Sequence, residues 1–397
     1  MSGLEIQPIQ VITDLAILLA VASVVTIIFH RLKQPLVVGY LIAGIIVGPY
    51  SPPFSLISNI PILNVFAEIG VILLLFTIGL EFPINRLRSI GRVIIAVSAF
   101  EITLMLAVSF ALGTFLQWQL FDTLFLGAAL ASSSTTIIAK VLSDMGKMKE
   151  TSSAIMLGIL VVEDVAVVLI LAMLQNVATA SAFSLTSSIL LLLELIAFIG
   201  GTLVIGHFFL PKLIDRVAKL ENRELFYILM LGLCFGFSII SYLIGFSVAI
   251  GAFIIGVVAA QSNSREAINR EIDPFQLVFG AIFFVSMGAL MDISQIATYW
   301  LPAVLVTLAV LGTKLATCGF GARLCGCDKK TSLRVGLGMA QIGEFAFIVI
   351  KTGQDLGKIS DFLLPVIGVA AIITSFATPY LIKFSFKEKN LNKANTT

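Results

Sequence analysis

The stretch LGILVVEDVAVVLILAML at residues 157–174 places two acidic residues, Glu163 and Asp164, at the centre of an apolar run. Its length approaches the roughly 20 apolar residues that carry a helix across a bilayer. Similar runs recur along most of the 397-residue chain, which is 58% hydrophobic and only 12% charged. Soluble domains are about 25% charged. The sequence therefore predicts an all-α polytopic membrane protein.

The apolar runs predict thirteen transmembrane helices, at 11–30, 35–50, 61–80, 91–114, 121–142, 153–174, 185–210, 224–243, 246–262, 275–291, 299–322, 331–353 and 361–384. Nearly all of the 25 Lys and Arg residues follow an odd-numbered helix or lie in the tail. Because cytoplasmic loops carry the excess of Lys and Arg, this alternation predicts a multi-pass protein of the cell membrane with its N-terminus outside and its C-terminus in the cytoplasm. The net charge of only +2 argues against a nucleic-acid partner.

The chain contains a weak internal repeat. LLFTIGLEFPINRL at 74–87 aligns with FFVSMGALMDISQI at 283–296, an offset of 209 residues (283 minus 74) that pairs Gly79 with Gly288. This offset covers seven predicted helices, and because seven is odd the second copy enters the membrane from the opposite side. We therefore predict repeat one at 11–174, a linker helix at 185–210 and repeat two at 224–384. Inverted repeats are typical of secondary transporters.

Two predicted helices contain poor helix formers near mid-span. One has five consecutive hydroxyl residues, Ser132, Ser133, Ser134, Thr135 and Thr136, and the other has Gly336, Gly338, Gly343 and Glu344. The offset of 209 (343 minus 134) pairs Ser134 with Gly343. Matched interruptions in two halves of a transporter indicate the transport site. The alternative is that small and hydroxyl residues only help the helices to pack closely.

The two central acids need an explanation, because a charge at mid-bilayer costs roughly 2.5–3.5 kcal/mol on insertion scales. Lys314 is the only base deep within a predicted helix and is the obvious counter-charge. Neighbouring residues of a helix point about 100° apart. We therefore assign Glu163 to Lys314 and leave Asp164 as the cation- and proton-binding residue. The alternative is a purely structural ion pair. Two further intramembrane acids, Glu101 and Glu194, have no partner evident from the sequence.

A buried carboxylate can hold a proton or a dehydrated monovalent cation, but not both at once. This competition, combined with alternating access, produces antiport. The alternative classes are a cation channel and an intramembrane protease. The inverted repeat favours alternating access over a channel, and adjacent acids have poor geometry for a catalytic dyad. We expect no cofactor and no resident metal, because Cys325 and Cys327 lack the further ligands that a structural metal site needs.

These residues resemble the cation:proton antiporter-2 family, which includes Kef-type potassium/proton and NapA-type sodium/proton antiporters. The resemblance spans about 10–385 and rests on LLLFTIGLEF (73–82), SSSTTIIAKVLSDMG (132–146), VVEDVAVV (161–168), EIDPFQLVFGAIFFVSMGALMD (271–292) and GEFAFIV (343–349). It implies an NhaA/NapA-like fold with crossed, unwound helices at Ser132–Thr136 and Gly338–Glu344. It also implies an essential acid at Asp164 and a lysine partner at Lys314.

The resemblance also implies a homodimer in membrane lipid that works as an elevator. The membrane antiporter domain would cover 1–384, with a core at about 61–174 and 275–384, a dimerisation domain at about 11–50 and 185–262, and a short cytoplasmic tail at 385–397. Relatives commonly carry Asp-Asp, linked to electrogenic sodium exchange, or Gln-Asp, linked to Kef-like potassium exchange, where this chain has Glu163 and Asp164. Because Glu163 is acidic, we expect exchange of Na⁺ or Li⁺ for H⁺, with K⁺/H⁺ exchange as the alternative and a cation channel as a remote one.

Overall fold

The computed structural model describes residues 8–32, 34–51, 55–57, 59–81, 91–179, 197, 200–202, 206, 208–220, 222–244 and 248–387. Within these ranges the regular structure is entirely helical. The predicted linker helix at 185–210, together with Glu194, and the tail at 385–397 lie largely outside the described residues. All-α architecture is thus confirmed for the described part of the chain.

The elements are α1 (Pro8–Leu32), α2 (Leu36–Val47), α3 (Ile60–Glu81), α5 (Arg92–Phe115), α6 (Leu120–Leu130), α7 (Thr135–Asp144), α8 (Thr151–Thr179), α10 (Arg223–Leu243), α11 (Val248–Ala259), α12 (Arg265–Ala289), η1 (Ile293–Gln295), α13 (Ile296–Leu324), α14 (Lys329–Met339), α15 (Phe345–Asp355) and α16 (Leu363–Phe386). Seven of them, α1, α3, α5, α8, α10, α13 and α16, are long and apolar enough to cross a membrane. The others are shorter or combine apolar and polar turns.

Most predicted helix boundaries agree with the structure to within a few residues, but α12 begins earlier than predicted. It starts at Arg265 instead of 275 and includes Pro274. The carboxylate of Asp215 accepts hydrogen bonds from both the backbone N–H and the hydroxyl of Ser264. This contact fixes the chain immediately before the helix begins, and residues 265–274, which lie outside the predicted helix at 275–291, form the first turns of α12.

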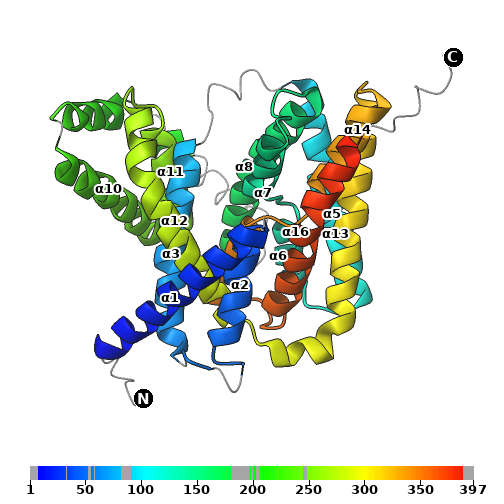
Figure 1. Ribbon diagram of the computed structural model, residues 1–397, viewed down its shortest axis with the longest axis horizontal. Helices are drawn as coiled ribbons and strands as arrows, with labels where there is room; N and C mark the ends of the chain where they lie inside the picture. Colours follow the sequence, from blue (N-terminus) through cyan, green and yellow to red (C-terminus); the bar gives the residue numbers. More distant parts are fainter. Residues whose placement is uncertain are drawn as a thin grey trace.

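The helices form two groups (Figure 1). The first group contains α1, α2, α3, α10, α11 and α12, and the second contains α5 to α8 and α13 to α16. Glycines allow very close packing in the first group. A Cβ atom on Gly256 of α11 would lie 2.2 Å from the carbonyl oxygen of Phe76 in α3, and one on Gly288 of α12 would lie 2.2 Å from that of Leu41 in α2.

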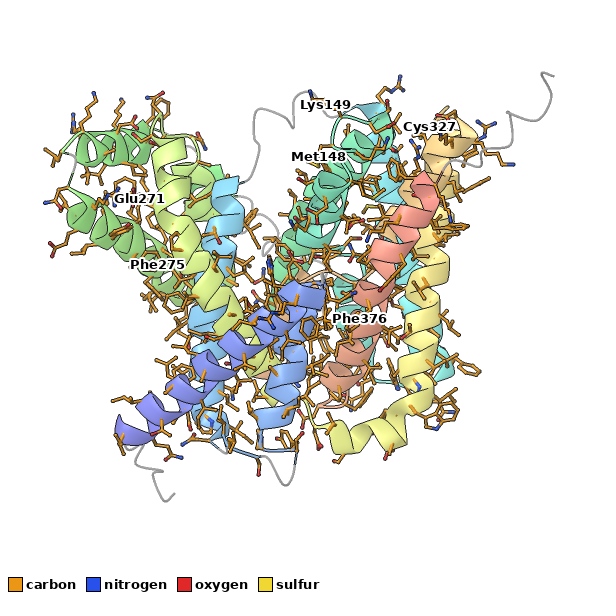
Figure 2. All side chains as sticks on the ribbon, viewed as in Figure 1. Met148, Lys149, Glu271, Phe275, Cys327 and Phe376 are labelled. Carbon is orange, nitrogen blue, oxygen red and sulfur yellow. The ribbon has the colours of Figure 1, made fainter. Side chains whose placement is uncertain are left out.

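The two groups meet where α1 and α2 approach α16, and also where the ring of Phe284 in α12 packs against that of Phe347 in α15. The rings of Phe29 and Phe376 lie 6.2 Å apart between centroids, and Gln34 donates a hydrogen bond of 3.2 Å to the hydroxyl of Tyr380. Figure 2 places Phe376 at this junction and Phe275 in the first group, where its ring lies 5.5 Å from that of Tyr227 in α10. The second group, which holds the predicted site residues, thus has its own set of packed helices.

Candidate functional site

The predicted helix at 121–142 is broken between α6 and α7. Helix α6 ends at Leu130, residues 131–134 are not helical, and α7 begins at Thr135. The side chain of Ser134 accepts a hydrogen bond from the backbone N–H of Ile137, which is the contact expected of an N-cap. The unwound segment is therefore shorter than predicted, because this cap starts α7 early and makes Thr135 and Thr136 helical. The side chain of Thr136 lies outside the described part of the structure.

The predicted helix at 331–353 is broken in the same way between α14 and α15, with residues 340–344 separating the two helices. The break was predicted to start at Gly338, but Gly338 remains inside α14, which ends at Met339. The backbone N–H of Gly343 donates a 3.0 Å hydrogen bond to the carbonyl oxygen of Ser132. A Cβ atom at Gly343 would lie 2.6 Å from the carbonyl carbon of Ser133, so only glycine fits. The two breaks therefore touch through their backbones.

Side chains add further contacts between the breaks. The amide of Gln341 donates to the carbonyl oxygen of Ser134 at 3.0 Å, and the hydroxyl of Ser133 donates to the carbonyl oxygen of Met339 at 3.4 Å. Unwound backbone is tolerated at membrane depth only where protein or a water-filled cavity satisfies it. These contacts pair carbonyl groups of the unwound backbone with hydrogen-bond donors and hold the two helix breaks against each other.

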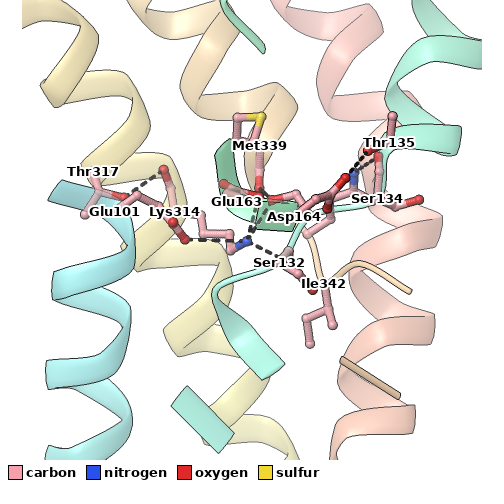
Figure 3. Close-up of polar contacts among 12 residues, drawn as sticks. Glu101, Ser132, Ser134, Thr135, Glu163, Asp164, Lys314, Thr317, Met339 and Ile342 are labelled. Atoms are coloured by element: carbon pink, nitrogen blue, oxygen red, sulfur yellow. Dashed lines mark hydrogen bonds and ion pairs between the residues drawn. The ribbon is translucent and has the colours of Figure 1, made fainter. Parts of the chain in front are cut away.

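Lys314 of α13 reaches the same place and is fully buried. Its ammonium donates to the carbonyl oxygen of Ser132 at 2.9 Å and to the hydroxyl of Ser133 at 2.7 Å. Two buried acids flank it: Glu101 Oε1 lies 3.5 Å from Nζ and Glu163 Oε2 lies 3.9 Å from it (Figure 3). Glu163 thus lies beside Lys314, but Glu101 of α5 is nearer. Sequence reasoning noted Glu101 as an intramembrane acid without finding this partner.

Asp164 points away from Lys314, toward the start of α7 (Figure 3). Thr135 donates a 3.4 Å hydrogen bond to its Oδ2, whereas its buried Oδ1 has no hydrogen-bond partner among the described residues. Glu163 is completely buried, but Asp164 is only half-buried. Glu344, directly before α15, is half-buried as well. The adjacent acids of α8 therefore occupy different surroundings, as their angular separation on a helix requires.

This arrangement combines a carboxylate that has an unpaired oxygen with hydroxyls and carbonyl oxygens of unwound backbone. In transporters with broken helices, unwound backbone carbonyls coordinate Na⁺ or H⁺. The described residues contain no group of three or more His, Cys, Asp and Glu that could hold a resident metal ion.

Known proteins resemble nearly the whole chain. The family described as "Sodium/hydrogen exchanger, transmembrane" matches residues 18–387. The Na⁺/H⁺-K⁺ antiporter GerN of Bacillus cereus is 33% identical over 362 residues, which cover 91% of this chain and 92% of GerN. The glutathione-regulated potassium-efflux system protein KefC of Klebsiella pneumoniae is 30% identical over 372 residues, covering 92% of this chain and 59% of KefC.

The fold also has a solved counterpart. The sodium proton antiporter MjNhaP1 of Methanocaldococcus jannaschii superposes with a TM-score of 0.70, covering 95% of this chain and 96% of MjNhaP1, at 18% sequence identity. At that identity the likeness concerns the fold alone. Sequence matches and structural match therefore agree over nearly the same residues.

Proposed function

Because the chain belongs to the sodium/hydrogen exchanger family, we propose that this antiporter exchanges Na⁺ or Li⁺ for H⁺, with Asp164 as the residue that binds either ion. The observation that carries the proposal is the half-buried carboxylate of Asp164, with one unpaired oxygen, beside two broken helices that touch. A charged group in such a place usually marks an ion pathway.

Competition at Asp164 couples the two fluxes. The ionised carboxylate attracts a cation, and protonation removes that charge and releases the cation. Thr135 fixes the orientation of the carboxylate through Oδ2, which leaves Oδ1 for the transported ion. In this proposal the site around Asp164 is lined by residues of the two helix breaks, Ser132, Ser133, Ser134, Gly343 and Glu344. If the site changes sides only when its carboxyl group holds a cation or a proton, the movement of cations in one direction is coupled to the movement of protons in the other.

The proposed architecture has thirteen helices in two inverted repeats, joined by a linker at 185–210. Reciprocal packing supports the repeat, in which α3 corresponds to α12 and α2 to α11. Helix α3 packs against α11 at Gly256, and the corresponding pair, α12 and α2, packs at Gly288. The packing of α3 and α12 with α1, α2, α10 and α11 favours placing both in the dimerisation domain. The proposed core then narrows from about 61–174 and 275–384 to the helices α5 to α8 and α13 to α16.

The remaining parts of the proposal follow from the charge pattern and the resemblance. The core moves as an elevator against a dimerisation domain that pairs two copies in the lipid bilayer, with the N-terminus outside and the C-terminus in the cytoplasm. K⁺/H⁺ exchange is the second candidate, because GerN is named for both Na⁺ and K⁺ and KefC for potassium. Na⁺ is placed first because the resemblance associates an acid at the position of Glu163 with sodium exchange.

The test uses the Asp164→Asn variant in everted membrane vesicles with a fluorescent probe of ΔpH. The protein with Asp164 should dissipate ΔpH when Na⁺ or Li⁺ is added, and the variant should lose this response, because its amide cannot hold a proton or a cation as a carboxylate does. Asp144→Asn, on the exposed end of α7, is the matched control and should behave like wild type. Comparing Na⁺, Li⁺ and K⁺ separates the two candidates. Unchanged flux in Asp164→Asn at equal protein levels would exclude this role.

A further inference from the structure

Glu101 is a completely buried acid that the proposed exchange does not use. It lies on α5, and its Oε1 is 3.5 Å from the ammonium of Lys314, compared with 3.9 Å for the nearest oxygen of Glu163. The two acids approach Lys314 from different helices (Figure 3). One buried lysine therefore has two carboxyl neighbours, and the nearer one is not part of the acidic pair of α8.

The hydrogen bonds of Lys314 fix the direction of its remaining charge. An ammonium has three N–H donors. One is directed to the carbonyl oxygen of Ser132, and a second to the hydroxyl of Ser133, which itself donates to Met339. The third is left for the acids. Lys314 is thus tied to the break between α6 and α7, and its net charge is balanced on the side of Glu101 and Glu163.

Charge balance gives Glu101 a role. A buried ammonium requires one carboxylate, and a buried charge left without a partner is strongly unfavourable. Building on the proposed function, we infer that Glu101 is a positioning residue for cation binding: its carboxylate balances Lys314 and keeps the ammonium away from Asp164. The charge of Glu163 is then redundant for this purpose, since either acid can balance the lysine.

The redundancy predicts a specific pattern of variants. With Glu101→Gln or Glu163→Gln alone, the remaining acid still balances Lys314, so the cation concentration for half-maximal exchange stays close to that of wild type. With both acids changed, Asp164 becomes the nearest remaining carboxylate and the lysine competes there with the cation. The fold-increase in the half-maximal cation concentration should then be about tenfold larger than the product of the fold-changes in the two single variants, as expected for coupled neighbours.

The measurement is cation-dependent proton flux in proteoliposomes, with the maximal rate and the half-maximal cation concentration determined separately per folded protein. A merely structural role would lower the amount of folded protein or the maximal rate without this shift. Combining Glu163→Gln with Glu101→Asp, in place of Glu101→Gln, keeps one carboxylate beside Lys314. This combination should show the half-maximal cation concentration of wild type. Glu68→Gln, which neutralises an exposed acid of α3, is the matched control and should change nothing.

Two results would overturn the inference: a large shift in Glu163→Gln alone, or a double variant whose shift equals the product of the single shifts. If the double variant does not fold, adding Lys314→Gln removes the unbalanced charge and should recover folded protein; failure to recover it also contradicts the inference. An absence of cation-dependent flux in wild type would instead reject the proposed function itself, so the two failures are distinguishable.

Discussion

At the level of single residues, the site depends on Lys314, because its charge and its hydrogen bonds both act on the break between α6 and α7. We predict that Lys314→Met lowers stability by about 3–5 kcal/mol, since it leaves two buried acids without a cation. Thermal unfolding of the purified protein in detergent measures this loss.

The matched control for Lys314 is Lys140→Met. Lys140 pairs with Asp144, but the two side chains are 75% and 59% exposed. An exposed pair contributes about 0–1 kcal/mol, so this variant should unfold close to wild type. Equal losses in the two variants would show that the buried cluster has no special electrostatic role.

The sequence indicated part of this cluster. Lys314 was predictable as a counter-charge because it is the only base deep in a predicted helix, and Glu163 and Asp164 because they interrupt an apolar run. The proximity of Glu101 to Lys314 was not predictable. It arises from the packing of α5 against α13, and neither helix carries a pattern that specifies the other as its neighbour.

At the level of elements, both helix breaks were expected from weak helix formers at matching positions, but their limits were not. The first unwound segment was expected to continue to Thr136, whereas Ser134 is its last residue, because its side chain caps α7 and makes the next two residues helical. Gly338 was likewise expected in a break and lies inside α14. Caps and backbone contacts between segments far apart in sequence set these limits, and residue composition does not report them.

Contact between the two breaks predicts the effect of Gly343→Ala. The new methyl group would meet the backbone of Ser133 at 2.6 Å, and backbone cannot move aside as a flexible side chain can. We expect loss of cation-dependent proton flux, together with a lower midpoint of thermal unfolding. Gly312→Ala on α13 is the matched control, because a methyl group there meets no atom within 4 Å, and it should retain both flux and stability. Retained flux in Gly343→Ala would mean that the breaks need not touch.

At the level of the whole molecule, the described contacts between the two helix groups are made by side chains, among them Phe284 of α12 against Phe347 of α15. Phe29 packs near Phe376, and Gln34 bonds to Tyr380. Within the first group, in contrast, backbones approach closely at Gly256 and Gly288. Close backbone packing makes the first group a rigid body, whereas a junction of side chains can slide. This difference is what an elevator requires, and it leads to a test of relative movement.

The test compares two cysteine pairs in a background whose four native cysteines are replaced by serine. Phe29→Cys with Phe376→Cys links the two groups, whereas Tyr227→Cys with Phe275→Cys links α10 to α12 inside the first group, where the rings lie 5.5 Å apart. Bridging with a short reducible bifunctional thiol reagent should stop cation-dependent proton flux only in the first pair, because only that bridge prevents the core from moving. Reduction should restore the flux. Full exchange by the bridged first pair would mean that transport proceeds with the two groups fixed at this junction, and the moving part would then have to be sought within the core, at the breaks themselves.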